Sequence, residues 1–175
     1  MGSPKGTEVD TQQPTLRERL LIEAEQFVRA VARLEGIRGI ALLGSILTPK
    51  QEPKDIDVLV VVDNEVDLAP LAKCARQLQG RAQSMNRGAD VFLANPEGEY
   101  LGRTCRWREC GPGIRAACDA LHCGRRHYLH DDLQDIRLAP EVVQMPPVRV
   151  WPVIEVRGDI PADLERFLER LNHAA

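Results

Sequence analysis

The sequence predicts an α/β (α+β) fold in which helices flank a mixed β-sheet. Helical and extended patterns alternate along the chain, in the order helix, strand, loop, strand, helix, strand, irregular region, strand and helix. The 175 residues are 43% hydrophobic and 28% charged, which is typical of a globular protein. Only 4% are aromatic, so we expect an aliphatic core.

The length predicts one domain, since domains commonly hold roughly 100–200 residues. Residues 1–14 are polar and without periodicity, and we expect a disordered tail there. The single domain then covers 15–175, with a core at 15–95, an Arg/Cys-rich segment at 100–130 and a C-terminal strand and helix within 148–172.

The net charge of −3 argues against a general nucleic-acid binder, which usually carries a basic excess. No apolar run is long enough to span a membrane, and the first residues lack the apolar stretch of a signal peptide. Together with an odd count of five cysteines, these features predict a cytoplasmic protein with reduced or metal-bound thiols.

The first helix is expected to begin after Thr15, because Thr15 and Glu18 have the spacing of a capping box. Gly36 is a plausible stop. Apolar residues recur at helical intervals: Leu16, Leu20, Ala24, Phe27, Val31 and Leu34. A solvated face is predicted for Arg17, Glu25, Arg29 and Arg33.

Three aliphatic strands are predicted next, at 37–43, 55–62 and 88–94. A turn and loop at 46–54 separates the first two, and a helix at 64–79 separates the second and third.

The remaining chain is less regular at first. No clean period is visible in 100–130, so this segment is expected to be irregular. A strand at 148–156 and an amphipathic helix at 161–171 complete the pattern.

Three carboxylates are the strongest chemical signal. Asp55 and Asp57 stand two residues apart at the start of a strand, so their side chains point to one face. Asp90 begins another strand, and three acidic groups would converge if the strands are neighbours. Adjacent carboxylates repel each other unless a cation joins them. Oxygen ligands favour Mg²⁺ or Mn²⁺, and three carboxylates can hold two such ions for phosphoryl displacement.

A phosphate-binding turn is predicted at Gly44-Ser45, directly after a strand. Glycine allows the backbone N–H groups to approach an anion closely, and the serine hydroxyl adds a donor. Lys50 and Lys54, in the loop that follows, would neutralise phosphate charge.

These residues resemble the signature of the DNA polymerase beta-type nucleotidyltransferase superfamily. Leu43-Gly44-Ser45 is followed after nine residues by Asp55-Ile56-Asp57-Val58, and a later strand carries the third acid, Asp90. The resemblance covers about residues 15–95. In size the chain is most similar to the minimal nucleotidyltransferases, some of which are toxin–antitoxin partners, and to the antibiotic nucleotidyltransferases.

The resemblance implies a nucleotidyltransferase-like sheet and transfer of a nucleoside monophosphate from a nucleoside triphosphate, expected to be ATP, with release of pyrophosphate. Asp55, Asp57 and Asp90 would be the metal ligands, and Asp90 also the base. The acceptor would be a hydroxyl or phosphate of a protein, an RNA or a small molecule, and no membrane is involved. Because Ile46-Leu47-Thr48 stands where many relatives carry an arginine, a non-catalytic, antitoxin-like binding module stays an alternative.

A second metal site is suggested by cysteines in the Arg/Cys-rich segment. A structural Zn²⁺ site would use the thiolates of Cys105, Cys110, Cys118 and Cys123, with His122, His127 or His130 as further candidates. The alternatives are buried reduced thiols or disulfides.

The same segment is rich in arginine, a residue suited to phosphate contacts. It holds Arg103, Arg106, Arg108, Arg115, Arg125 and Arg126. They would bind a triphosphate or an RNA end, or form a solvated face paired with Asp131, Asp132 and Asp135. A zinc-containing RNA-binding protein is therefore a further alternative.

Overall fold

The computed structural model describes residues 12–108, 110, 126–130 and 136–174. These residues form four α-helices, one short 3-10 helix and one mixed sheet of seven strands, so the α/β class is confirmed. The predicted tail at 1–14 lies mostly outside the described residues. None of the described helices is long and apolar enough to cross a membrane.

The strands of the sheet are β1 Ile37–Leu43, β2 Asp55–Val62, β3 Gly88–Ala94, β4 Tyr100–Thr104, β5 Leu129–His130, β6 Val148–Trp151 and β7 Glu155–Val156. Their order across the sheet is β5-β4-β3-β2-β1-β6-β7. Only β2 and β3 pair in parallel, because helix α2 (Ala69–Gln83) returns the chain between them, and the other neighbours are antiparallel.

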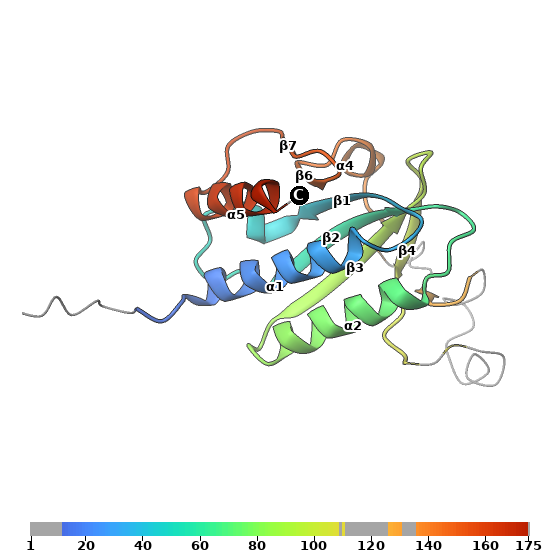
Figure 1. The fold of residues 1–175 in the computed structure, drawn as a ribbon, viewed down its shortest axis with the longest axis horizontal. Coiled ribbons are helices and arrows are strands. Elements are labelled where there is room, and N and C mark those ends of the chain that lie inside the picture. The colour runs from blue at the N-terminus through green and yellow to red at the C-terminus, as the bar shows by residue number, and fades with distance from the viewer. Residues whose placement is uncertain (1–11, 109, 111–125, 131–135, 175) are drawn as a thin grey trace, which may run out of the picture.

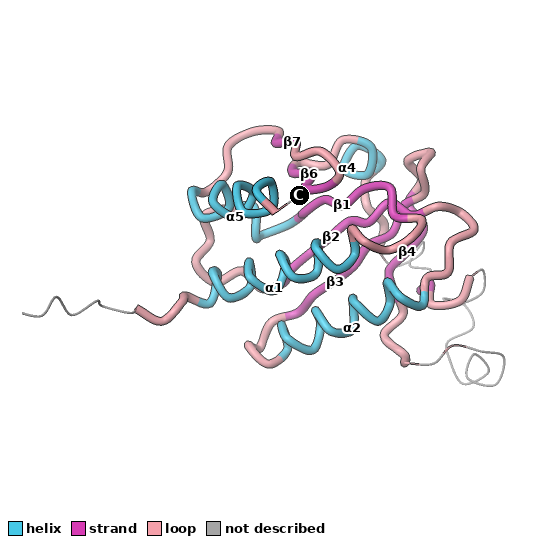
Figure 2. Tube along the Cα trace, in the orientation of Figure 1, coloured by secondary structure: helices cyan, strands magenta, loops and turns pink. Residues whose placement is uncertain are grey.

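The described helices are α1 Leu16–Val31, the 3-10 helix η1 Gly44–Leu47, α2 Ala69–Gln83, α4 Pro140–Gln144 and α5 Ala162–His173. Three of them cover one face of the sheet: α1 and α2 lie side by side across it, and α5 packs beside α1 (Figure 1). The short α4 packs on the opposite face, and η1 connects β1 to β2 (Figure 2).

The core is aliphatic, as the composition predicts. Alternate residues of β2, such as Ile56 and Val58, pack against the helices, whereas Leu59 packs with Phe92 and Val143 on the opposite face. Since side chains alternate along a strand, Asp55 and Asp57 lie on the face of Leu59, away from α1 and α2.

Several predicted elements are confirmed. The bounds of β1, β2 and β3 coincide with the predicted strands, and Thr15 caps α1 in a capping box with Glu18. The C-terminal helix is present one residue later than predicted at its start and two at its end.

The predicted end of the first helix and both predicted bounds of the second helix are wrong. α1 ends at Val31, five residues before Gly36. α2 begins at Ala69 and not at 64, because Pro70, which lacks an N–H, fits in the first turn of a helix.

Two expectations for the second half are also corrected, and one element there was not expected. Within 100–130, the described residues include strands β4 and β5, whose pairing depends on distant partners and not on local periodicity. The strand predicted at 148–156 is two antiparallel strands, because Pro152 cannot donate to a ladder and the chain turns back there. The short helix α4 was not predicted.

Candidate active site

Three carboxylates meet on the face of the sheet that α1 and α2 leave uncovered. Asp57 on β2 is the register partner of Asp90 on β3, and Asp55 is the partner of Gly88. All three side chains are partly exposed. Neighbouring strands lie about 4.8 Å apart, so the fold brings together the three acids that the sequence analysis selected.

The surroundings of Asp57 oppose the ionisation of its carboxyl group. Burial, and then the negative charges of Asp90 and Asp55, raise the pKa of Asp57 to about 6. A carboxylate that is desolvated beside two like charges is stabilised by a proton or by a cation. A cation bound beside Asp57 would therefore stabilise its ionised carboxylate.

The Gly44-Ser45 turn lies directly beside Asp57. Leu43, the last residue of β1, pairs with Asp57, and the chain then enters η1. Gly44 has a φ of +74°, and a Cβ at this position would overlap Asp57 Oδ2. Only glycine satisfies both the backbone conformation and this close approach.

Gly88 has the same relation to the other acid of the pair. A Cβ on Gly88 would overlap Asp55 Oδ1. The Gly88 N–H donates to the carbonyl oxygen of Lys54 over 3.1 Å, which holds the starts of β2 and β3 together. Each carboxylate of the Asp55–Asp57 pair thus lies against a glycine.

Arg103 on β4 and Arg106, two residues after the end of that strand, contact the third acid. Arg103 Nη1 lies 3.0 Å from Asp90 Oδ1, and Arg106 Nη2 lies 3.4 Å from the same oxygen. Arg103 is largely covered, whereas the Arg106 side chain is 68% exposed. Positive charge is therefore available at the site, concentrated on Asp90.

Arg126, another arginine of the predicted phosphate-binding group, lies elsewhere. Its guanidinium donates to the carbonyl oxygens of Asp63 and Val66, beyond the C-terminal end of β2. Asp55 and Asp57 are at the opposite end of that strand, so Arg126 is not part of the carboxylate site. Arg115, Arg125 and the proposed partners Asp131, Asp132 and Asp135 lie outside the described residues.

The two lysines of the loop differ in position. Lys54 directly precedes Asp55, and its side chain is exposed at the border of the site. Lys50 is also exposed, in the loop between η1 and β2. Their predicted contact with phosphate stays a prediction.

Arg17 is the residue near the site that the sequence analysis placed wrongly. Its side chain is only 3% exposed, not solvated. Nη2 donates to the Ile46 carbonyl oxygen over 2.6 Å, Nη1 to that of Lys50 over 3.1 Å, and Nε to Asp163 Oδ2 over 2.5 Å. The missed signal was its spacing of three and four residues from the buried Leu20 and Leu21.

The carboxylate oxygens of Asp55 and Asp57 suit a hard divalent cation, because such ions prefer negatively charged oxygen ligands. Asp55 and Asp57 would hold such an ion. In the part of the chain that the structure describes, no three His, Cys, Asp or Glu side chains are arranged as a metal site. Asp90 instead directs Oδ1 to the arginines, so its role as a third ligand stays a prediction.

Half of the cysteines of the predicted zinc site lie outside the described residues. Cys118 and Cys123 lie outside the described residues. Cys105 is buried and Cys110 half-buried, and both are free thiols. Zinc binding by these cysteines stays a prediction.

A comparison with known protein families shows to which family the chain belongs. Residues 7–111 match a family of unknown function, DUF6932. The chain belongs to the DUF6932 family. No curated protein and no solved structure matches it. The region that matches DUF6932 contains the Gly44 turn, all three carboxylates, Arg103 and Arg106, whereas Asp163 on α5 lies beyond it.

Proposed function

We propose that this protein is a metal-dependent nucleotidyltransferase, which transfers a nucleoside monophosphate from a nucleoside triphosphate to an acceptor hydroxyl or phosphate. The observation that carries the proposal is the register of β2 and β3, which puts Asp57 opposite Asp90 with Asp55 on the same face. The Gly44 turn lies against Asp57, which supports the proposal that its backbone would bind phosphate beside the acids.

Asp55 and Asp57 would hold Mg²⁺ or Mn²⁺, and a bound ion would offset the charge of the triphosphate and favour ionisation of the attacking group. The raised pKa of Asp57 supports this assignment, because two carboxylate neighbours oppose its ionisation until a cation arrives.

The chain itself would contribute positioning and charge. Backbone N–H groups of the Gly44-Ser45 turn and the Ser45 hydroxyl would donate to the phosphate oxygens. Lys54 directly precedes Asp55 in the chain, and Arg106, whose side chain is mostly exposed, would exchange its contact with Asp90 for a phosphate. These contacts would fix the α-phosphate for in-line attack.

Asp90 is the residue best placed to accept the acceptor's proton. Arg103 and Arg106 orient its carboxylate, and Asp57 lies opposite on the neighbouring strand. The acceptor oxygen forms a bond to the α-phosphorus while the bond to pyrophosphate breaks. The proton passes to Asp90, and pyrophosphate leaves.

We place the reaction in the cytoplasm with ATP as the expected nucleotide. The described cysteines are free thiols, which fits a reducing compartment. The acceptor class is left to the experiment, with RNA, protein and small hydroxyl compounds as its arms.

A non-catalytic nucleotide-binding module is the second candidate. The ion pairs of Asp90 with Arg103 and Arg106 favour this second candidate. They occupy the carboxylate that would otherwise serve as the third metal ligand. In this case the protein would bind the nucleotide without turnover.

Incubation with α-labelled ATP and Mg²⁺ or Mn²⁺, with each acceptor class, tests the proposal. We expect label transfer by the wild type and at least a hundredfold loss in the double variant Asp55→Asn/Asp57→Asn, since the loss of key electrostatic groups typically costs about that much. Asp63→Asn is the matched control, because Asp63 lies just past the other end of β2 and pairs with Arg38.

Equal transfer by the wild type and the double variant would contradict the proposal. Nucleotide binding that depends on Asp55 and Asp57, but without transfer to any acceptor, would favour the binding module.

A further inference from the structure

Arg17 connects three parts of the molecule at a buried position. It projects from the first turn of α1, and its guanidinium contacts η1, the loop after η1 and the first turn of α5. A buried guanidinium is costly unless its donors are satisfied, and here each nitrogen has a partner. This arrangement fixes the loop to α1 and α5.

The two carbonyl partners lie on either side of one turn. Ile46 precedes it, and Lys50 follows it. Ser45 lies one residue before Ile46, and its carbonyl oxygen accepts from both the N–H and the hydroxyl of Thr48, over 3.1 and 2.8 Å. Arg17 therefore holds both ends of a turn that also ties down the backbone of Ser45.

We propose that Arg17 is a positioning residue that holds residues 44–50 in the conformation that binds the triphosphate, and that Asp163 extends this control to α5. This inference rests on the proposed function. Arg17 would not touch the nucleotide. It would spare the complex the cost of ordering the turn when the nucleotide binds.

The proposal gives α5 a part in the site. Asp163 Oδ2 accepts from Arg17 Nε, and Asp163 lies in the first helical turn, where a negative charge is favoured. Residues outside the region that matches DUF6932 would thus support nucleotide binding.

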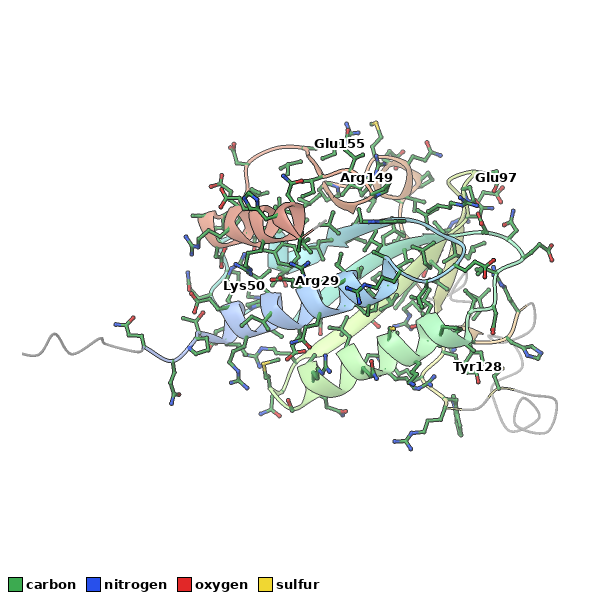
Figure 3. The ribbon with its side chains drawn as sticks, viewed as in Figure 1. Arg29, Lys50, Glu97, Tyr128, Arg149 and Glu155 are labelled. Carbon is green, nitrogen blue, oxygen red and sulfur yellow. The ribbon has the colours of Figure 1, made fainter. Side chains whose placement is uncertain are left out.

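Arg29 offers a matched control on the same helix. Arg29 lies on α1 (Figure 3), and its Nη2 donates to the Arg170 carbonyl oxygen over 3.0 Å, so it also joins α1 to α5. Its other hydrogen bonds go to Glu25, and none goes to residues 44–50, all of which the structure describes. Substituting Arg29 removes a link between these helices and leaves the contacts of Arg17 in place.

The test compares Arg17→Lys and Arg17→Met with Arg29→Lys and Arg29→Met in the full chain. Binding of ATP with Mg²⁺ is measured by titration calorimetry, and binding of Mn²⁺ alone by electron paramagnetic resonance. We expect the Kd for ATP to rise about tenfold or more in both Arg17 variants, because hydrogen bonds to a charged group are lost. Mn²⁺ binding should stay within about twofold, since Asp55 and Asp57 are unchanged.

Limited trypsin digestion reports on the turn without nucleotide. Lys50 is exposed and is followed by Gln51, so cleavage there should accelerate about tenfold in the Arg17 variants relative to the Arg29 variants. Should Arg17→Met fail to fold, Arg17→Lys and Asp163→Asn provide the same comparison.

Unchanged ATP binding in the Arg17 variants would overturn the inference, as would equal weakening by the Arg29 variants. If the wild type itself does not bind ATP, the proposed function fails and this inference fails with it. Faster cleavage at Lys50 would then still show that Arg17 holds the turn, and so would separate the two failures.

Discussion

Asp57 is the site residue whose ionised carboxylate the metal-free fold disfavours. Burial, Asp90 and Asp55 raise its pKa to about 6, above the usual value of 3.8. The folded state therefore binds this proton more tightly than the unfolded state does. The resulting penalty is absent below about pH 4, grows as the pH rises through 6, and is complete above it.

We predict that Asp57→Asn stabilises the metal-free protein at pH 8. The gain should be about 1–2 kcal/mol, after allowance for the partial exposure of the side chain, and should vanish near pH 4. Thermal unfolding with a chelator at both pH values measures it.

Asp63→Asn is the opposite case and serves as the control. Arg38 lowers the pKa of Asp63, so neutralising Asp63 should not stabilise the protein at pH 8. An Asp57→Asn variant that is less stable than the wild type at pH 8 would contradict the electrostatic account of the site.

At the scale of the element, the turn from β1 into η1 is where backbone geometry matters most. We predict that Gly44→Ala destabilises the protein by about 1–3 kcal/mol, because alanine disfavours a φ of +74° and its Cβ would overlap Asp57 Oδ2. Urea unfolding of the full chain measures the change.

Gly80→Ala provides the comparison. Gly80 lies within α2, and a Cβ there meets nothing within 4 Å. This substitution should stabilise the protein by about 0.5–1 kcal/mol. Equal free energies of unfolding for the two variants would show that Gly44 is not constrained by Asp57.

Local patterns explain which elements could be predicted. β1, β2 and β3 are short aliphatic runs ending at glycine, aspartate or a turn, and these signals lie within the strands themselves. The strands β4 and β5 have weak patterns of their own, and β5 is only two residues long. Their pairing depends on partners distant in the sequence, which local periodicity does not reveal.

The candidate site likewise contains some features that local sequence patterns predict and others that they do not. Asp55 and Asp57 share a face because they are two residues apart, and Asp90 joins them because the chain returns through α2 to a parallel neighbour. Arg17 contacts Asp163, and Arg103 contacts Asp90. Tertiary packing brings these residues together, and their spacing in the sequence does not indicate it. No pattern in the sequence specifies such pairs.

At the scale of the whole molecule, the sheet concentrates the candidate chemistry in one place. The C-terminal ends of β1 and β4 meet the N-terminal ends of β2 and β3, since each outer strand is antiparallel to its inner neighbour. This topology gathers the glycine turn, the three acids and two arginines on one face. α1 and α2 cover the opposite face with the main core (Figure 1).

A crystal structure of the full chain with Mn²⁺ and a non-hydrolysable ATP analogue tests the central claim most directly. We predict an anomalous manganese signal between Asp55 and Asp57, with the triphosphate against the backbone of Gly44 and Ser45. Well-ordered carboxylates without manganese between them, or a nucleotide bound away from the Gly44 turn, would contradict the account.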